Sequence, residues 1–520
     1  MKKIAKFLIV LGMMGQLSSC DYLDIVPDER AQESDTWKTE GAVRGYLYSC
    51  YGYLPANRTF GNSYWLAEEL TAVTKELFTT FKYGYYSPVS LGFTSNTWST
   101  IWNGIHQCYM FQESLKQVSN EYVTDEMKKQ YLAESNFLIA YYHFLSMRSY
   151  GPTMIIRSVI DLETPISGFP ERSSIDEVVA FINEKLDEAM SEGGLPTTWS
   201  GKDYGRATRL AALALKSRVY LYAASPLYNG NTEMYADFRS PLDGRQLIAQ
   251  EKSQAKWEIS ATQTKYAIDE VEKAKFHLYH DADAGEPSDA KPGLPNKAQR
   301  RLRYTNIDNQ TGNNPEIIWA DTRNDDYYGI QRRCPPRQTL GGKFAGISMT
   351  NCPTLQTIEA FYTKNGLPIN KDKTFDYDER YEYINAPENC DGNNYEDLVK
   401  YANFTPSSDK VMRLCTDREP RFYAWTTYHN GYFEFGKYNN EEISADPAKR
   451  AIRIHLLRDD PHGRGNRTDQ EYSISGFGNK KGVVPSAEWN VIEYPFPLFR
   501  LAELYLNYAE ALVELDRLSE

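Results

Sequence analysis

The chain has 520 residues, of which 41% are hydrophobic, 25% charged and 13% aromatic. This composition is that of a globular protein, and it excludes collagen-like, disordered and multi-span membrane proteins. The 58 Lys and Arg against 70 Asp and Glu give a net charge of −12. Because the chain is acidic and lacks a long basic run, nucleic acid is excluded as a partner. The 39 tyrosines suit burial with the hydroxyl kept in water, or stacking on flat polar ligands.

The N-terminus has the features of a targeting segment. Three lysines among the first six residues precede an apolar stretch at 7–14, which is far shorter than the ~20 residues that a spanning helix needs. Leu-Ser-Ser-Cys at 17–20 resembles the lipobox of bacterial lipoproteins, whose cysteine receives a diacylglyceryl group. Residues 1–19 are therefore predicted to be a lipoprotein signal peptide, and Cys20 the residue through which acyl chains anchor the protein. A plain secretory signal and a buried N-terminal helix are the alternatives.

Four segments carry the apolar period of helices that pack on a core. They cover residues 134–150, 175–190, 206–224 and 497–518. The first should end at Gly151-Pro152, and the second should begin after Ser173 or Ser174 as the N-cap. Alanines in the third provide a small-residue face that lets a neighbouring helix approach closely. Such helices resemble the stacked pairs of tetratricopeptide repeats, although the sequence has no strict period of about 34 residues.

The amino-acid composition changes between residues 279 and 450. Gly, Pro, Asn and Asp become frequent there, which favours turns and loops. Short apolar runs at 317–319 and 433–435 are typical of strands or extended loops. The predicted fold class is therefore mainly α: a tetratricopeptide-like helix-pair scaffold that carries a loop-rich insertion. Long ordered loops on a rigid scaffold usually carry the binding surface.

Seven sequence blocks occur in the order that they have in one known family. They are residues 21–27 (DYLDIVP), 133–152, 205–216 (GRATRLAALALK), 314–319 (NPEIIW), 353–361, 418–423 (REPRFY) and 500–511 (RLAELYLNYAEA). With these blocks, the chain resembles the SusD/RagB family of outer-membrane nutrient-binding lipoproteins. Each block alone is a weak signal, but their order extends over almost the whole chain.

The resemblance implies a SusD-like fold with an N-terminal helical part at 20–278 and a loop-rich insertion and C-terminal part at 279–520. In the family, further helices follow the last matched helix, so the resemblance also implies that the C-terminal helices are truncated after Glu520. It implies a lipoprotein that lies at the cell surface, anchored in the outer membrane by its lipid. Such a protein captures an oligosaccharide, or sometimes a peptide, for a SusC-like TonB-dependent transporter, without catalysis or a cofactor.

Two loop regions combine aromatic rings with hydrogen-bonding side chains, which suit the C–H faces and hydroxyl rim of a sugar. The residues predicted to bind the ligand are Tyr83, Tyr85, Tyr86 and Asn96 in the first region and Asn324, Asp326, Tyr327, Tyr328 and Arg332 in the second. The alternative for each tyrosine is packing on the scaffold or facing the transporter. Trp98 and Trp102, four residues apart in a predicted helix, are interpreted as core residues.

Signals for catalysis and for metal binding are weaker. Glu68-Glu69 and Asp325-Asp326 are carboxylate pairs, and a glycosidase needs two carboxyl groups ~5–10 Å apart. However, 70 acidic residues make such pairs frequent by chance. His277 and His280 lie three residues apart, but no third metal ligand is apparent. The functional alternatives are a lipid-anchored glycoside hydrolase and a surface protein that binds peptide or no small ligand.

Overall fold

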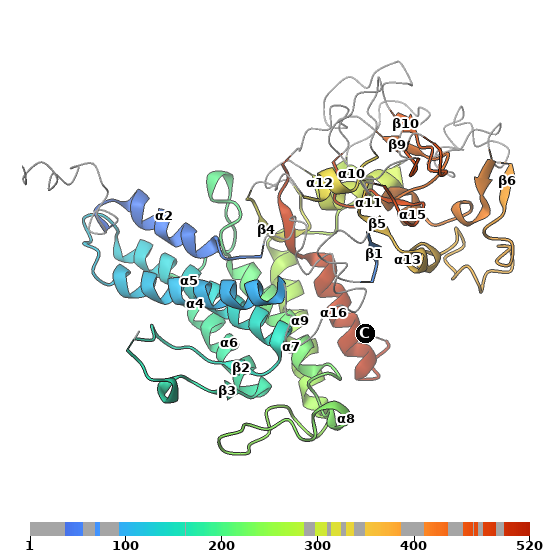
Figure 1. The fold of residues 1–520 in the computed structure, drawn as a ribbon. Helices are drawn as coiled ribbons and strands as arrows, with labels where there is room; N and C mark the ends of the chain where they lie inside the picture. Colours follow the sequence, from blue (N-terminus) through green and yellow to red (C-terminus); the bar gives the residue numbers. More distant parts are fainter. Residues whose placement is uncertain are drawn as a thin grey trace, which may run out of the picture.

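The fold joins a bundle of long helices to a part built from short helices, two-stranded ribbons and loops (Figure 1). The computed structural model describes residues 37–55, 68–72, 93–161, 163–284, 297–308, 314–323, 329–336, 349–385, 410–434, 451–460, 462–465, 472–484 and 493–519. The helices are α2 (Glu40–Tyr51), α4 (Phe93–Leu115), α5 (Asp125–Tyr150), α6 (Ile175–Ala189), α7 (Arg209–Ala224), α8 (Thr232–Tyr235), α9 (Gln254–Lys273), α10 (Asp281–Ala284), α11 (Lys297–Ile307), α12 (Ile330–Arg333), α13 (Leu355–Ala360), α15 (Pro420–Trp425) and α16 (Leu501–Glu514). The strands are β1 (Leu70–Thr71), β2 (Thr153–Met154), β3 (Arg172–Ser173), β4 (Ile317–Asp321), β5 (Cys352–Pro353), β6 (Tyr383–Asn385), β7 (Lys410–Met412), β8 (Thr426–Thr427), β9 (Tyr432–Glu434), β10 (Ala451–Arg453), β11 (Gly478–Asn479) and β12 (Phe496–Arg500).

Helix α5 lies at the centre of the helical bundle. Its neighbours are α2, α4, α6 and α7, and its side chains from Ala133 to Met147 are buried on every side. A helix that is surrounded in this way has no solvent-facing stripe over its buried length. It ends at Tyr150, directly before Gly151, as predicted, and it begins earlier than predicted, at Asp125.

The starts of α6 and α7 are fixed by side-chain caps. The hydroxyl of Ser174 accepts the Glu177 N–H at 3.3 Å, and the Glu177 carboxylate accepts the Ser174 N–H at 2.7 Å. This reciprocal capping box satisfies two backbone donors at the helix start. The hydroxyl of Thr208 caps α7 by accepting the Ala211 N–H at 3.0 Å. Helix α6 therefore begins where the sequence predicts it, whereas α7 begins at Arg209, three residues later than predicted.

The last predicted helix is wrong over its first residues. Residues 497–500 belong to strand β12, which pairs antiparallel with β4, and α16 begins only at Leu501. Pro495 and Pro497 favour extended backbone in the residues before them. The ring of Phe499 stacks on Trp319 of β4, with centroids 5.8 Å apart. Tertiary pairing thus overrides the helical period at this point.

Two predicted strands are present. Residues 317–319 lie in β4, whose five residues are all buried. Residues 433 and 434 lie in β9, which pairs with β10, whereas Phe435 lies outside the described residues.

Helix α16 returns to the helical bundle from the far end of the chain. It packs against α7 and α9 (red beside green in Figure 1). The short helices and ribbons between α9 and β12 therefore form an insertion in a mainly α scaffold, as predicted. Among the described helices, none is both long enough and apolar enough to cross a membrane.

A buried ion pair joins α5 to the start of α7. Arg206 donates to the fully buried Glu134 from Nη2 at 2.5 Å and from Nε at 3.2 Å, and to Asp203 from Nη1 at 2.7 Å. Tyr51 of α2 donates to Glu134 at 2.6 Å, and the Tyr51 oxygen accepts the Ala207 N–H at 2.9 Å. Burial raises the pKa of Glu134, against the opposing effect of its hydrogen bonds. Three helices thus meet at one carboxylate.

Gly205, directly before this arginine, must be a glycine. Its φ is +99°, and a Cβ at this position would lie 2.8 Å from the Thr322 side chain. Only glycine adopts such backbone without steric cost. Its carbonyl accepts the indole N–H of Trp319 at 2.9 Å, which ties β4 to the start of α7.

His143 is a buried, neutral histidine in the middle of α5. Its Nε2 accepts the Ile156 N–H at 3.3 Å, so the ring proton lies on Nδ1, which donates to the Ile139 carbonyl at 2.8 Å. Burial, with a smaller contribution from the charges of Lys185 and Arg157, lowers the pKa of His143 to about 4.

The ion pair predicts a large stability effect. Arg206→Ala is expected to lower the free energy of unfolding by about 3–5 kcal/mol, because the Glu134 carboxylate stays buried without its partner. Lys116→Ala is the control, since it breaks an exposed pair with Glu113 and should cost less than about 1 kcal/mol. Urea unfolding followed by circular dichroism measures both, and equal losses would contradict this role for Arg206.

The second prediction concerns acid stability. Between pH 6.5, the ordinary pKa of histidine, and about pH 4, the unfolded chain protonates His143 but the folded chain does not. Stability therefore falls as the pH falls through this window, by about 3 kcal/mol for this group. Urea unfolding of the wild type and of His143→Gln at pH 7, 5.5 and 4 should show the gap between them shrinking by that amount. Parallel pH profiles would refute the assignment.

Candidate functional site

A cavity of about 850 Å³ lies between the helical bundle and the loop-rich part. Helices α5, α7 and α16 line one side, and residues of α13, α15 and β11 line the other. Small-molecule sites in proteins have volumes of roughly 300–1,000 Å³. The cavity is therefore large enough to hold a ligand of several rings.

Aromatic rings form much of the cavity wall. Trp425, Phe361, Phe496 and Tyr222 line it and are only partly buried. The indole N–H of Trp425 donates to the Leu302 carbonyl at 3.3 Å, which fixes the orientation of that ring. Exposed ring faces of this kind bind flat apolar surfaces, including the C–H faces of sugars.

Three charged side chains on the cavity wall are available to a ligand. Arg148, Lys481 and Glu69 line it, and among the described residues none of the three charged groups has a hydrogen-bond or ion-pair partner. Lys481 is exposed toward the cavity, and its ammonium lies 4.6 Å from the centre of the Trp425 ring. The surrounding protein lowers the pKa of Lys481, and the charge of Arg500 lowers it further. A partly desolvated charge gains from a ligand that offers hydrogen bonds.

Two other arginines hold the walls together. Arg218 of α7 donates to Glu503 of α16 from Nε at 2.6 Å and from Nη2 at 2.5 Å, and it donates to the Leu498 carbonyl at 2.9 Å. Arg500 donates to Glu316 at 2.6 Å. Because both arginines are already paired with carboxylates, we assign them the role of positioning the cavity wall and not of binding a ligand.

Arg418 hydrogen-bonds to the backbone of Phe361, a residue that lines the cavity. Its guanidinium donates to the carbonyls of Leu414 at 2.6 Å, Ile358 at 2.7 Å and Phe361 at 2.7 Å. Ile358 and Phe361 lie at the C-terminal end of α13, where carbonyls lack partners within the helix. Arg418 also lies over the ring of Phe422 at 4.8 Å, and burial lowers its pKa.

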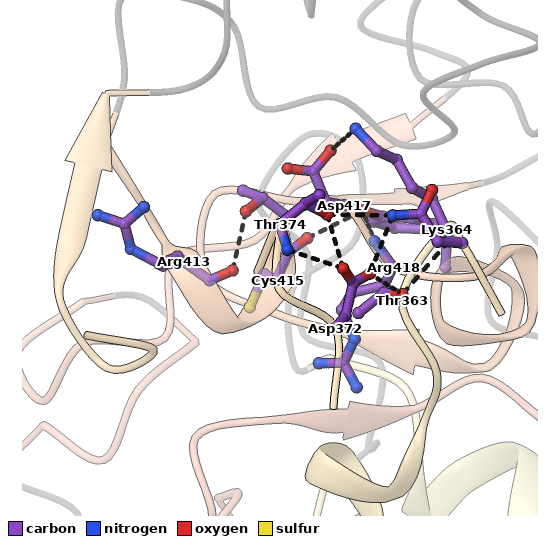
Figure 2. Close-up of polar contacts among 11 residues, drawn as sticks. Thr363, Lys364, Asp372, Thr374, Arg413, Cys415, Asp417 and Arg418 are labelled. Carbon is purple, nitrogen blue, oxygen red and sulfur yellow. Dashed lines mark hydrogen bonds and ion pairs between the residues drawn. The ribbon is translucent and has the colours of Figure 1, made fainter. Parts of the chain in front are cut away.

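Asp372 fastens the turn that follows α13, as Figure 2 shows. Its carboxylate accepts hydrogen bonds from Thr363 at 2.6 Å, from Asn365 at 2.9 Å, and from the N–H and hydroxyl of Thr374 at 2.9 and 2.8 Å. These bonds, led by that of Thr363, hold the pKa of Asp372 well below its ordinary value. The carboxylate is occupied by the fold, so we assign it a structural role.

Most of the site residues predicted from the sequence fall outside the described residues. These are Cys20, Tyr83, Tyr85, Tyr86, Asn324, Asp326, Tyr327 and Tyr328. Asn96 lies near the start of α4, and Arg332 lies half-buried in α12. Arg332 is close in sequence to Ile330, which lines the cavity.

Both predicted loop regions connect to the cavity wall. Leu70 of β1 lines the cavity shortly before residues 73–92, and Ile330 lines it shortly after residues 324–328. On the other side of the second region, Arg323 donates to the carbonyl of Pro55 at 3.0 Å, and Pro55 also lines the cavity.

The sequence did not predict the residues that line the cavity. Trp425, Phe361 and Lys481 come from separate segments, and each has the ordinary character of a core or surface residue. Only the packing of α13, α15 and the segment after β11 brings them to one wall. No local sequence signal marks them.

The tryptophan pair and the first carboxylate pair are described by the structure. Trp102 packs against the core, as interpreted, and Trp98 is half-buried between Trp102 and Tyr150, with centroids 5.3 and 4.9 Å away. Glu68 and Glu69 are both exposed, and Glu69 lines the cavity. Asp325 and Asp326 lie outside the described residues.

Two family models match the chain. The model of the SusD family matches residues 315–520, and a model described as starch-binding associating with outer membrane matches residues 21–221. The chain belongs to the SusD/RagB family. The resemblance carried by the seven sequence blocks is thereby confirmed.

Solved structures agree with this family membership. The structure named BT4246 is 27% identical, with a TM-score of 0.74 over 92% of this chain and 79% of that one. A SusD-like protein from Bacteroides fragilis NCTC 9343 is 20% identical, with a TM-score of 0.61 over 95% and 78%. A SusD-like carbohydrate binding protein from the same organism is 18% identical, with a TM-score of 0.56 over 93% and 75%. No curated protein matches. The predicted SusD-like, mainly α fold is confirmed.

The anchoring of Phe361 in this SusD-family protein generates a prediction. Arg418→Leu is expected to lower the free energy of unfolding by about 3 kcal/mol, because several buried carbonyls lose a charged donor. Arg421→Leu is the matched control, since its guanidinium pairs with the neighbouring Glu419 at the surface and should cost less than about 1 kcal/mol. Urea unfolding measures both variants, and an equal effect would refute the anchoring role.

Proposed function

We propose that this SusD-family protein is a cell-surface glycan-binding lipoprotein that captures oligosaccharides and delivers them to a SusC-like TonB-dependent transporter. The description of the matched family model, starch-binding associating with outer membrane, supports both the ligand class and the location. The single observation that carries the proposal is the cavity, whose wall combines partly exposed aromatic rings with unengaged charged groups.

The lining suits a neutral ligand that is rich in hydroxyl groups. A sugar hydroxyl both donates and accepts hydrogen bonds, and the wall offers donors in Arg148 and Lys481 and an acceptor in Glu69. The ring of Trp425 provides a surface on which a pyranose can stack.

The two loop regions extend the same site in this proposal. The residues proposed to contribute to it are Tyr83, Tyr85, Tyr86 and Asn96 of the first region and Asn324, Asp326, Tyr327, Tyr328 and Arg332 of the second. The connection of both regions to cavity-lining residues, Leu70 and Ile330, supports this arrangement.

The membrane attachment follows from Cys20. A diacylglyceryl group on its sulfur, together with a further acyl chain, would provide the two or more chains that stable anchoring needs. The protein would then work at the outer membrane by binding alone, with no turnover of the glycan and no cofactor.

Substitution of Trp425 tests the site. Trp425→Ala is expected to weaken glycan binding by about 5- to 150-fold, which corresponds to the ~1–3 kcal/mol of a base stacked on an aromatic ring. Maltoheptaose is the first probe, because the matched model is described as starch-binding, and a glycan array follows. Isothermal titration calorimetry measures affinity, and Trp37→Ala, a partly buried tryptophan on the helical bundle, is the control.

Other outcomes separate the alternatives. If Trp425→Ala leaves affinity unchanged while alanines at 83, 85 and 86 or at 327 and 328 abolish it, the loops alone form the site. Release of reducing ends from any glycan would favour the glycoside hydrolase. Failure of the folded protein to bind any glycan would favour a surface protein that binds peptide or no small ligand.

A further inference from the structure

Two imidazoles and one carboxylate converge on the turn between α9 and α10. His277 Nε2 lies 3.3 Å from Asp283 Oδ1, and His280 Nδ1 lies 2.9 Å from Asp283 Oδ2. One ligand atom from each of the three side chains lies within 4.8 Å of the others. The two histidine rings are stacked, with centroids 4.8 Å apart and planes at 23°, so their edges face the same carboxylate. The sequence offered only the histidine pair, and the third group comes from the fold.

The backbone of this turn is fixed by contacts with distant segments. The His277 N–H donates to the Pro315 carbonyl at 3.1 Å. The Tyr279 N–H donates to the Glu316 carboxylate at 2.9 Å, and its hydroxyl donates to Asp308 at 3.1 Å. The three side chains are therefore presented by a backbone that is already ordered, which reduces the entropy cost of gathering ligands around an ion.

We propose that His277, His280 and Asp283 bind a divalent cation of the zinc class. Two imidazole nitrogens and a carboxylate oxygen are the donor set that suits zinc, nickel and copper, whereas calcium and magnesium prefer oxygen ligands alone. In the bound state, each imidazole would coordinate the ion through the nitrogen that faces Asp283 and carry its proton on the other ring nitrogen. The cation takes the place of the hydrogen bonds between the imidazoles and the carboxylate, and water completes its coordination.

A second histidine cluster is a weaker candidate. His429, His455 and Asp460 also bring ligand atoms within 4.8 Å of one another. There, His429 Nδ1, which lies 3.5 Å from Asp460, already accepts the Leu456 N–H at 3.0 Å, and Asp460 accepts the Leu457 N–H at 2.9 Å. A backbone hydrogen bond therefore competes for the ligand nitrogen of His429. Asp283 also accepts a backbone N–H, from His280 at 2.8 Å, so the two clusters differ at their imidazoles and not at their carboxylates. Neither facing nitrogen of His277 and His280 has such a bond among the described residues.

The position of the site gives the ion a structural role. The turn follows α9, a long helix of the bundle, and leads into α10, the first helix of the loop-rich part. A bound ion would cross-link this junction and stabilise the folded state by an amount that rises with the logarithm of the metal concentration. This inference is independent of the glycan proposal, because the three residues do not line the cavity.

Isothermal titration calorimetry of the full chain with Zn²⁺ alone tests the proposal. We expect one ion per chain and a higher thermal unfolding midpoint, whereas Ca²⁺ and Mg²⁺ should change neither signal. The variants His277→Ala and His280→Ala should each weaken binding by at least about tenfold, since even residues that support a ligand affect affinity to that extent. His106→Ala, at an exposed histidine of α4, is the matched control and should bind as the wild type does.

Three results would overturn the proposal. Unchanged Zn²⁺ affinity in the double variant His277→Ala/His280→Ala would exclude these ligands. Loss of binding only in His429→Ala or His455→Ala would assign the ion to the second cluster. Equal weak binding in every variant would indicate general attraction to the acidic surface. Because the histidines are largely exposed, both variants should fold, and circular dichroism checks this.

Discussion

The arrangement of the helical bundle depends on one buried carboxylate. Glu134 lies within α5, where no water reaches it, so its charge is tolerable only if Arg206 and Tyr51 stay in hydrogen-bonding distance. Arg206 directly precedes α7, and Tyr51 ends α2. The requirement to satisfy this group therefore sets the relative position of three helices. Arg218 of α7 in turn forms an ion pair with Glu503 of α16, which attaches this C-terminal helix to the bundle.

Several residues of the sequence blocks that identify the SusD family form such contacts between distant segments. Pairs of blocks meet in space through four contacts: Glu134 with Arg206, Trp319 with Gly205, Glu316 with Arg500, and Arg418 with the carbonyls of Ile358 and Phe361. These contacts build the frame, and of their residues only Arg500 and Phe361 line the cavity. A family match thus establishes the scaffold. It does not identify the ligand, because ligand specificity depends on side chains outside these contacts.

The frame also explains where new sites can arise. The cavity lies where the bundle meets the loop-rich part, so aromatic and charged side chains from both parts face one space. The histidine turn exists because α9 ends against the segment before β4, which fixes the backbone of residues 277–279. In both places, the groups that carry the proposed chemistry lie beside groups that carry the fold.

Local signals in the sequence were sufficient for much of the scaffold. The period and the breaker pair at Gly151 predicted the end of α5, the cap at Ser174 predicted the start of α6, the period over 206–224 predicted α7 apart from its first three residues, and the apolar run at 317–319 predicted β4. Tertiary structure alone decided that residues 497–500 form a strand, that Trp425 and Lys481 share a wall, and that Asp283 joins the histidine pair. The physical reason is range: periods and caps act within a few residues, whereas a strand pairing, a cavity or a set of ligands depends on segments that only the packed chain brings together.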